Sequence, residues 1–276
     1  MNEVSDTELD DSMDRFEAAS NAHSVLLPQI ELNQVLVAPD GSNQDTLTAA
    51  LADHFEVPVQ SADVTGNDPP YRQILQQAAA IRAGLIVVPA PFREDFAELG
   101  AASIGSNLDL LLHHRATPLL VVRDPARDLA ALVREIVIPL SVVAADDIRA
   151  AAWAFRALTP RGRIRLLAVA DTERLVRDRH VSTETLEFDT LDESDLSGLD
   201  QPEMAGLVAA VQRHAAETDV GCRVSIRVGQ SVKATAEFTN DLQCLIVATC
   251  PLGSDPSGVQ AIHALTRLSK NPILIV

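Results

Sequence analysis

Few side chains of this sequence have types and spacing that could support chemistry, and the pair Gly105-Ser106 is the clearest candidate. A Gly-Ser pair at the start of a helix presents backbone N–H groups and a hydroxyl, which together can hold a phosphate or another anion. The alternative is that the pair only caps the helix. Asp40 follows a short apolar run and precedes a glycine. It is either a ligand or a turn residue that hydrogen-bonds its own backbone.

Other arrangements that carry catalysis are missing from the sequence. Gly-x-Ser-x-Gly, Gly-x4-Gly-Lys-Ser/Thr and Gly-x-Gly-x-x-Gly do not occur, which argues against the hydrolases, P-loop enzymes and dinucleotide oxidoreductases that use them. The Ser-Gly-Gly-x-Asp-Ser signature of ATP pyrophosphatases is also missing. His113 and His114 are adjacent on a predicted helix, so they point in different directions, and no third ligand follows nearby. We therefore expect no catalytic residue and no metal.

The charge of the chain narrows the range of partners. The formal net charge of −17 repels nucleic acid and anionic membranes, so no nucleic-acid partner is expected. Lysine occurs only at Lys233 and Lys270, and an acidic surplus with scarce lysine predicts a halophilic surface. No apolar run reaches the roughly 18–20 residues that span a bilayer. The acidic N-terminus lacks the order of a signal peptide, so the sequence predicts a cytoplasmic protein without direct membrane insertion.

The elements that must position these residues alternate between strands and helices. Apolar runs predict nine strands, at residues 35–38, 57–64, 85–88, 119–122, 136–139, 164–169, 223–228, 244–248 and 273–276. Helical periodicity predicts helices at residues 47–55, 74–81, 106–114, 146–158, 203–217, 232–239 and 259–268. Such alternation, with strands that are continuous apolar runs, predicts an α/β protein whose parallel sheets are covered by helices on both faces.

The remaining segments divide the chain into two parts. Residues 1–28 predict an acidic disordered leader, residues 123–133 a linker, and residues 170–200 a long acidic loop. The first part has room for one strand–helix pair fewer than the second. Residues 85–122 and 245–276 repeat one pattern, which is an apolar run, a loop with proline, a helical stretch, a proline and a second apolar run. This repeat indicates two copies of one α/β unit.

The repeated unit resembles the universal stress protein family in its tandem two-domain form. The resemblance rests on Val37-Ala38-Pro39-Asp40-Gly41-Ser42, on the block that contains Gly105-Ser106 and Ala116-Thr117-Pro118, and on the repetition of that block. It implies two Rossmann-like domains of the adenine nucleotide alpha hydrolase type, with a shortened first domain at residues 29–124 and a second at residues 134–276. It also implies that the last strands of the two domains pair, either within the chain or in self-association.

The nucleotide motif of that family is degenerate here. Nucleotide-binding members carry Gly-x2-Gly-x9-Gly-Ser/Thr after the fourth strand, and the spacing places Phe92 and Asp95 at the first two glycines. Phe92 would fill the space that the backbone needs near a phosphate, and Asp95 would repel it. Asp40 matches the family's adenosine-binding aspartate. In the second copy Leu140 stands at that position and the loop is shorter, so no nucleotide is expected there.

The resemblance implies a non-catalytic protein of the stress response. It would act through an unidentified protein partner, or as a weak adenine-nucleotide sensor that binds ATP or AMP through Asp40, Gly105 and Ser106. An alternative is a cytoplasmic regulatory module that binds a membrane transporter. A third hypothesis is a nucleotide-hydrolysing enzyme.

Overall fold

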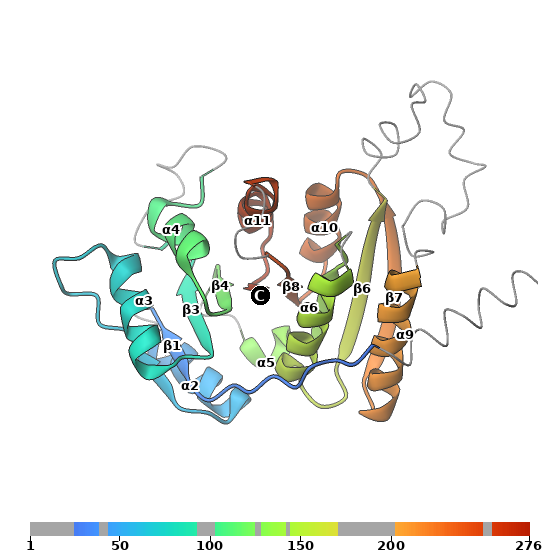
Figure 1. The fold of residues 1–276 in the computed structure, drawn as a ribbon, viewed down its shortest axis with the longest axis horizontal. Helices are drawn as coiled ribbons and strands as arrows, with labels where there is room; N and C mark the ends of the chain where they lie inside the picture. Colours follow the sequence, from blue (N-terminus) through green and yellow to red (C-terminus); the bar gives the residue numbers. More distant parts are fainter. Residues whose placement is uncertain are drawn as a thin grey trace, which may run out of the picture.

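The computed structural model describes residues 25–38, 44–92, 103–124, 128–141, 144–170, 202–250 and 256–276. In these residues nine strands form one continuous sheet in the order β2-β1-β3-β4-β9-β8-β5-β6-β7 (Figure 1). The strands are β1 (Val35–Val37), β2 (Val59–Ser61), β3 (Leu85–Pro89), β4 (Leu119–Val122), β5 (Glu135–Pro139), β6 (Arg163–Ala170), β7 (Gly221–Val228), β8 (Leu245–Ala248) and β9 (Ile273–Ile275). The predicted α/β class with a sheet flanked by helices is confirmed.

The helices cover both faces of the sheet. They are α2 (Gln44–Phe55), α3 (Pro70–Ile81), α4 (Ser106–His114), α5 (Leu129–Leu132), α6 (Ala144–Ala157), α9 (Pro202–Glu217), α10 (Ser231–Asn240) and α11 (Pro256–Leu268). Side chains of α2, α5, α6 and α9 form the apolar core on one face. Those of α3, α4, α10 and α11 form the core on the other face. None of these described helices is long and apolar enough to cross a lipid bilayer.

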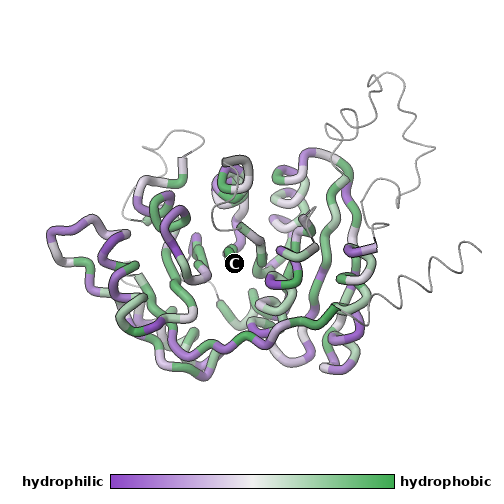
Figure 2. Tube along the Cα trace, viewed as in Figure 1, coloured by the Kyte–Doolittle hydropathy of each residue, from purple (hydrophilic) through white to green (hydrophobic). Residues whose placement is uncertain are grey.

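Burial explains why the strands read as continuous apolar runs. All residues of β1, β3, β4, β8 and β9 are buried, because helices pack on both sides of these central strands. The strands are accordingly among the most hydrophobic segments of the chain (Figure 2). The edge strand β7 instead has intermediate and exposed residues throughout, since none of the described strands lies beyond it.

Two predicted segments differ from the structure. The strand predicted at residues 57–64 is confined to Val59–Ser61, since it lies at the other edge of the sheet, where β1 is its one partner among the described strands. The linker predicted at residues 123–133 contains the short helix α5. Asp128 caps this helix, because its side chain accepts a hydrogen bond from the N–H of Ala130 at 3.0 Å. The leader predicted at residues 1–28 and the acidic loop at residues 170–200 lie mostly outside the described residues.

The two halves of the sheet share one strand order. In the second half the order is β7-β6-β5-β8-β9, and in the first it is β2-β1-β3-β4. Aligned in this way, the described residues of the first half contain no counterpart of β7 and of α9, in agreement with the predicted loss of one strand–helix pair. The domain boundaries at residues 29–124 and 134–276 stay a prediction, and the sheet itself runs without a break from one half to the other.

The halves meet where β4 pairs with β9, which is the one antiparallel pairing among the described strands. Leu120 lies opposite Leu274, and each of them is the second residue after a proline, Pro118 or Pro272. The register is therefore symmetric about this leucine pair, like a local two-fold axis. The predicted pairing of the two last strands within the chain is confirmed. We call this junction, formed by β4 and β9 with α4 and α11, the seam.

Candidate functional site

The first half places Gly105 and Ser106 at the N-terminus of α4, as the sequence predicts. Gly105 holds the N-cap position with a φ of 93°, in the positive-φ region that favours glycine. Its N–H donates a hydrogen bond to Oγ of Ser103 at 3.1 Å. Ser106 is the first residue of the helix. The predicted ligand Asp40 lies outside the described residues, so the structure does not bring it together with this pair.

Phe92 stands where the nucleotide motif has its first glycine, and it is a core residue. Its side chain is 1% exposed and belongs to the apolar core beneath α3 and α4. Ile104, directly before Gly105, is buried in the same core. A phenyl ring is thus packed where the motif has a residue without a side chain. Asp95, at the second glycine position, lies outside the described residues.

The second half carries a buried carboxyl group that the sequence did not single out. Asp147, in the first turn of α6, is fully buried, and its Oδ2 accepts a hydrogen bond from the N–H of Ser141 at 2.7 Å. Burial raises the pKa of this carboxyl to about 7, against the hydrogen bond from Ser141, which lowers it, while the charge of Asp146 adds to the rise. Oδ1 has no hydrogen-bond partner among the described residues.

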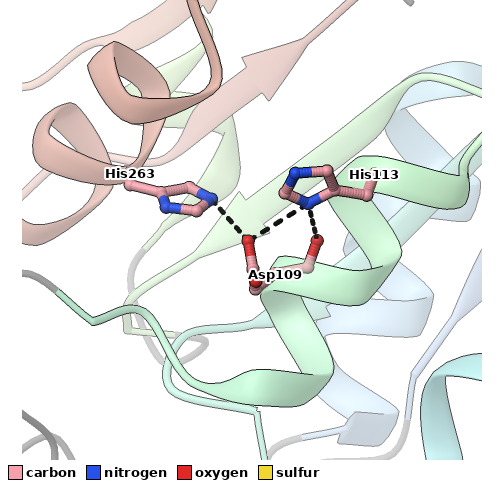
Figure 3. Close-up of side chains that lie close together, drawn as sticks. All are labelled: Asp109, His113 and His263. Carbon is pink, nitrogen blue, oxygen red and sulfur yellow. Dashed lines mark hydrogen bonds and ion pairs between the residues drawn. The ribbon is translucent and has the colours of Figure 1, made fainter. Parts of the chain in front are cut away.

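A second group of polar side chains lies at the seam and combines two helices (Figure 3). Nε2 of His263, on α11, is 2.8 Å from Oδ1 of Asp109, on α4. Nδ1 of His113, one turn after Asp109, is 3.2 Å from the same oxygen and 2.9 Å from the backbone carbonyl oxygen of Asp109. We call Asp109, His113 and His263 the seam triad. One potential ligand atom from each residue lies within 4.8 Å of the other two.

Burial differs among the three members of the seam triad. The side chain of His263 is 18% exposed, that of Asp109 40% and that of His113 47%. Burial lowers the pKa of His263, and the positive charge of His113 lowers it further, while the carboxylate of Asp109 acts in the opposite direction. The triad therefore combines one partly buried imidazole with a carboxylate and a second imidazole that water can reach.

The symmetry of the seam explains why these residues meet. Asp109 lies nine residues before Pro118, and His263 lies nine residues before Pro272. They are equivalent positions of the two copies, and the local two-fold axis brings them face to face. Only neighbours along the chain are visible in the sequence, so the contact of Asp109 with His263 of the other half was not predicted. His114, the adjacent histidine, stacks on Tyr71.

Two arginines hold the seam together across the halves. Arg115 is buried, and its Nη2 donates a hydrogen bond to the carbonyl oxygen of Cys250 at 3.2 Å. Burial lowers the pKa of this guanidinium, with Cys250 acting in the opposite direction. Nη1 of Arg123 donates to carbonyl oxygens at the end of α11, the nearest being that of Arg267 at 3.0 Å. A cation at a helix C-terminus stabilises the last turn.

A cavity of about 280 Å³ lies at the end of β7, lined by Val228, Gly229, Gln230, Lys233, Ala234 and Glu237. None of the predicted site residues lines it. Lys233 and Glu237 form an exposed ion pair at 3.9 Å, as side chains one helical turn apart commonly do. This cavity therefore offers no chemistry beyond that of a solvated helix surface.

Comparison with known proteins shows likeness in structure rather than in sequence. No family model and no curated protein matches the chain. A universal stress protein from Archaeoglobus fulgidus superimposes with a TM-score of 0.53 at 10% sequence identity, over 99% of this chain and 95% of that one. A protein of unknown function from Pseudomonas aeruginosa superimposes with a TM-score of 0.50 at 13% identity, over 100% and 89% of the two chains. At these identities the likeness establishes architecture alone, and this chain has the Rossmann-like α/β fold of a universal stress protein.

Proposed function

We propose that this protein is a regulatory protein of the universal stress type, which acts in the cytoplasm by binding a protein partner rather than by catalysis. The observation that carries the proposal is the burial of Phe92. Nucleotide-binding members of the resembled family have a glycine at this position, and the glycine lets the loop approach the phosphates. A core phenyl ring at the same place disfavours a phosphate cradle of that kind.

The remaining residues of this site favour recognition of a ligand over catalysis. The N-terminus of α4 presents a partial positive charge, so it favours an anion. Among the described residues, no activated nucleophile stands beside it. The N-terminus of α4 is compatible with weak binding of ATP or AMP. In that case Gly105 and Ser106 would contact the phosphates, and Asp40 would contact the adenosine. Hydrolysis would need a further group that positions water.

Titration calorimetry with ATP and with AMP tests the proposal, combined with an assay of phosphate release. We expect dissociation constants in the millimolar range, which correspond to a binding free energy of about −4 kcal/mol. We also expect no release of phosphate. Ser106→Ala should weaken any binding that occurs. Ser231→Ala is the matched control, since Ser231 is the first residue of α10, away from this site. Phosphate release that persists through purification and is lost in Ser106→Ala would overturn the non-catalytic proposal.

A further inference from the structure

We propose that the seam triad binds a divalent transition-metal ion, with zinc as the preferred ion, and that this ion links the two halves of the sheet. The inference goes beyond the regulatory function proposed above and is independent of it. It rests on the ligand atoms of Asp109, His113 and His263, on their spacing and on their place in the fold (Figure 3).

The spacing of the atoms is close to that of a tetrahedral site. With metal–ligand bonds of 2.0–2.1 Å, neighbouring ligand atoms lie about 3.3 Å apart. Oδ1 of Asp109 lies 2.8 Å from Nε2 of His263 and 3.2 Å from Nδ1 of His113. An ion would move each of these nitrogens away from Oδ1 by less than about 1 Å. The two imidazole nitrogens lie within 4.8 Å of each other, so they would have to approach by up to about 1.5 Å. The half-exposed His113 can make that adjustment by rotating its side chain, which gives up the 2.9 Å contact of Nδ1 with the backbone carbonyl oxygen of Asp109.

The contact between Asp109 and His263 is short, and both of its atoms are buried. Oδ1 of Asp109 and Nε2 of His263 are closed off from solvent, and neither has a hydrogen-bond partner among the described residues. The 2.8 Å separation is that of an ion pair when His263 is protonated. Buried polar atoms that lack a hydrogen bond are costly. A cation between the two lone pairs would satisfy both atoms at once.

The types of the donors select the ion. Two imidazole nitrogens and one carboxylate oxygen form a ligand set typical of zinc sites with three protein ligands, in which water occupies the fourth position. Magnesium and calcium prefer oxygen ligands and more of them. We therefore expect the site to discriminate strongly against magnesium. Access is open on the side of His113, which is half exposed.

The place of the triad gives the ion a structural role. Asp109 and His113 lie on α4, which belongs to the first half, and His263 lies on α11, which belongs to the second. These two helices flank the pairing of β4 with β9. An ion held by both helices joins the halves across the seam. Because the intact site exists only in the folded chain, binding should also stabilise the fold.

Calorimetric titration of the full-length protein with zinc chloride tests this inference, after treatment with a chelator that is then removed. We expect one zinc ion per chain and no detectable heat with magnesium chloride. His263→Gln, which keeps a polar side chain, should weaken zinc binding at least about tenfold, since even indirect partners of metal ligands contribute that much. His113→Ala should weaken it similarly. His114→Ala is the matched control, because His114 is the adjacent histidine that lies outside the triad.

Thermal unfolding with and without zinc provides a second measurement. The wild type should unfold at a higher temperature with zinc, and His263→Gln should show no such rise. Circular dichroism of each variant without metal verifies that the fold is kept. The inference is overturned if the wild type binds no zinc, if His263→Gln binds as tightly as the wild type, or if His114→Ala loses as much affinity as His113→Ala. With cobalt in place of zinc, intense visible absorption would support a tetrahedral site, and weak absorption would contradict it.

Discussion

The buried carboxyl of Asp147 should make the stability of this protein depend on pH in a defined direction. The pKa of the group is about 7 in the folded chain, against an ordinary value of 3.8. Folding therefore takes up a proton between these two values. The stability that protonation gives is present in full below the lower value, and it is lost as the pH rises through the upper one.

The size of the effect follows from the two pKa values. Their difference of about three pH units corresponds to about 4 kcal/mol, at about 1.4 kcal/mol for each unit. Asp147→Asn removes the charge and keeps an oxygen that can accept the hydrogen bond from the N–H of Ser141. The new amide N–H groups need an acceptor in a buried site, which offsets part of the gain. We expect the variant to be more stable than the wild type by about 2–4 kcal/mol near pH 8.5, and equally or less stable near pH 4.

Urea unfolding of both proteins across this pH range measures the difference directly, and the subtraction removes the contribution of other titrating groups. Asp219→Asn is the control, because this carboxylate is 87% exposed and its loss should change stability by no more than about 0.5 kcal/mol. A carbon-13 titration of the Asp147 carboxyl should show a midpoint near 7. A stability difference that stays constant from pH 4 to about pH 8.5 would refute the reasoning, since it would mean that the carboxyl has the same pKa in both states.

Three further predictions concern packing, backbone conformation and surface charge. Phe92→Ala should lower the free energy of unfolding by about 3–5 kcal/mol in urea titrations. Phe238→Ala, at a partly exposed position, should lower it clearly less. Equal losses in the two variants would contradict the core role of Phe92. Gly105→Ala should lower the free energy of unfolding by about 1–3 kcal/mol in the same assay, because a φ of 93° strains any other residue. Unchanged stability would contradict this explanation. If the net charge of −17 marks a salt-adapted surface, the midpoint temperature of thermal unfolding should rise between about 0.1 M and 2 M KCl, because salt screens the repulsion between carboxylates. An unchanged midpoint would argue against halophilic adaptation.

Much of the fold could be predicted because the local pattern and the tertiary environment agree. The strand at residues 85–88 is a continuous apolar run because helices cover β3 on both faces. Its sequence alone therefore indicates that it is buried. The missing strand–helix pair of the first half follows from the length between Gly41 and Arg72 alone. The length of the edge strand predicted at residues 57–64 was overestimated, since an apolar run does not show where the neighbouring strand ends.

The sites could be predicted less well because they depend on contacts between distant segments. Asp109 and His263 lie far apart in the sequence, and no spacing along one helix reveals that they face each other. The burial of Asp147 depends on how α6 meets the sheet, whereas in sequence it is an ordinary acidic residue of a first helical turn. Phe92 was the exception. The size of its side chain, at a position where the motif has glycine, already indicated that the phenyl ring occupies the space needed near a phosphate.

The symmetric register of β4 and β9 has a consequence for what the seam can contain. In a dimer of two identical chains, a residue on the two-fold axis faces its own copy, so that an aspartate would oppose an aspartate and a histidine would oppose a histidine. Here the two equivalent positions belong to one chain and need not be identical. Asp109 can therefore face His263, and a carboxylate and an imidazole occupy a place where a symmetric assembly could hold only like groups. The covalent link between the halves thus permits a chemistry at the axis that exact symmetry forbids.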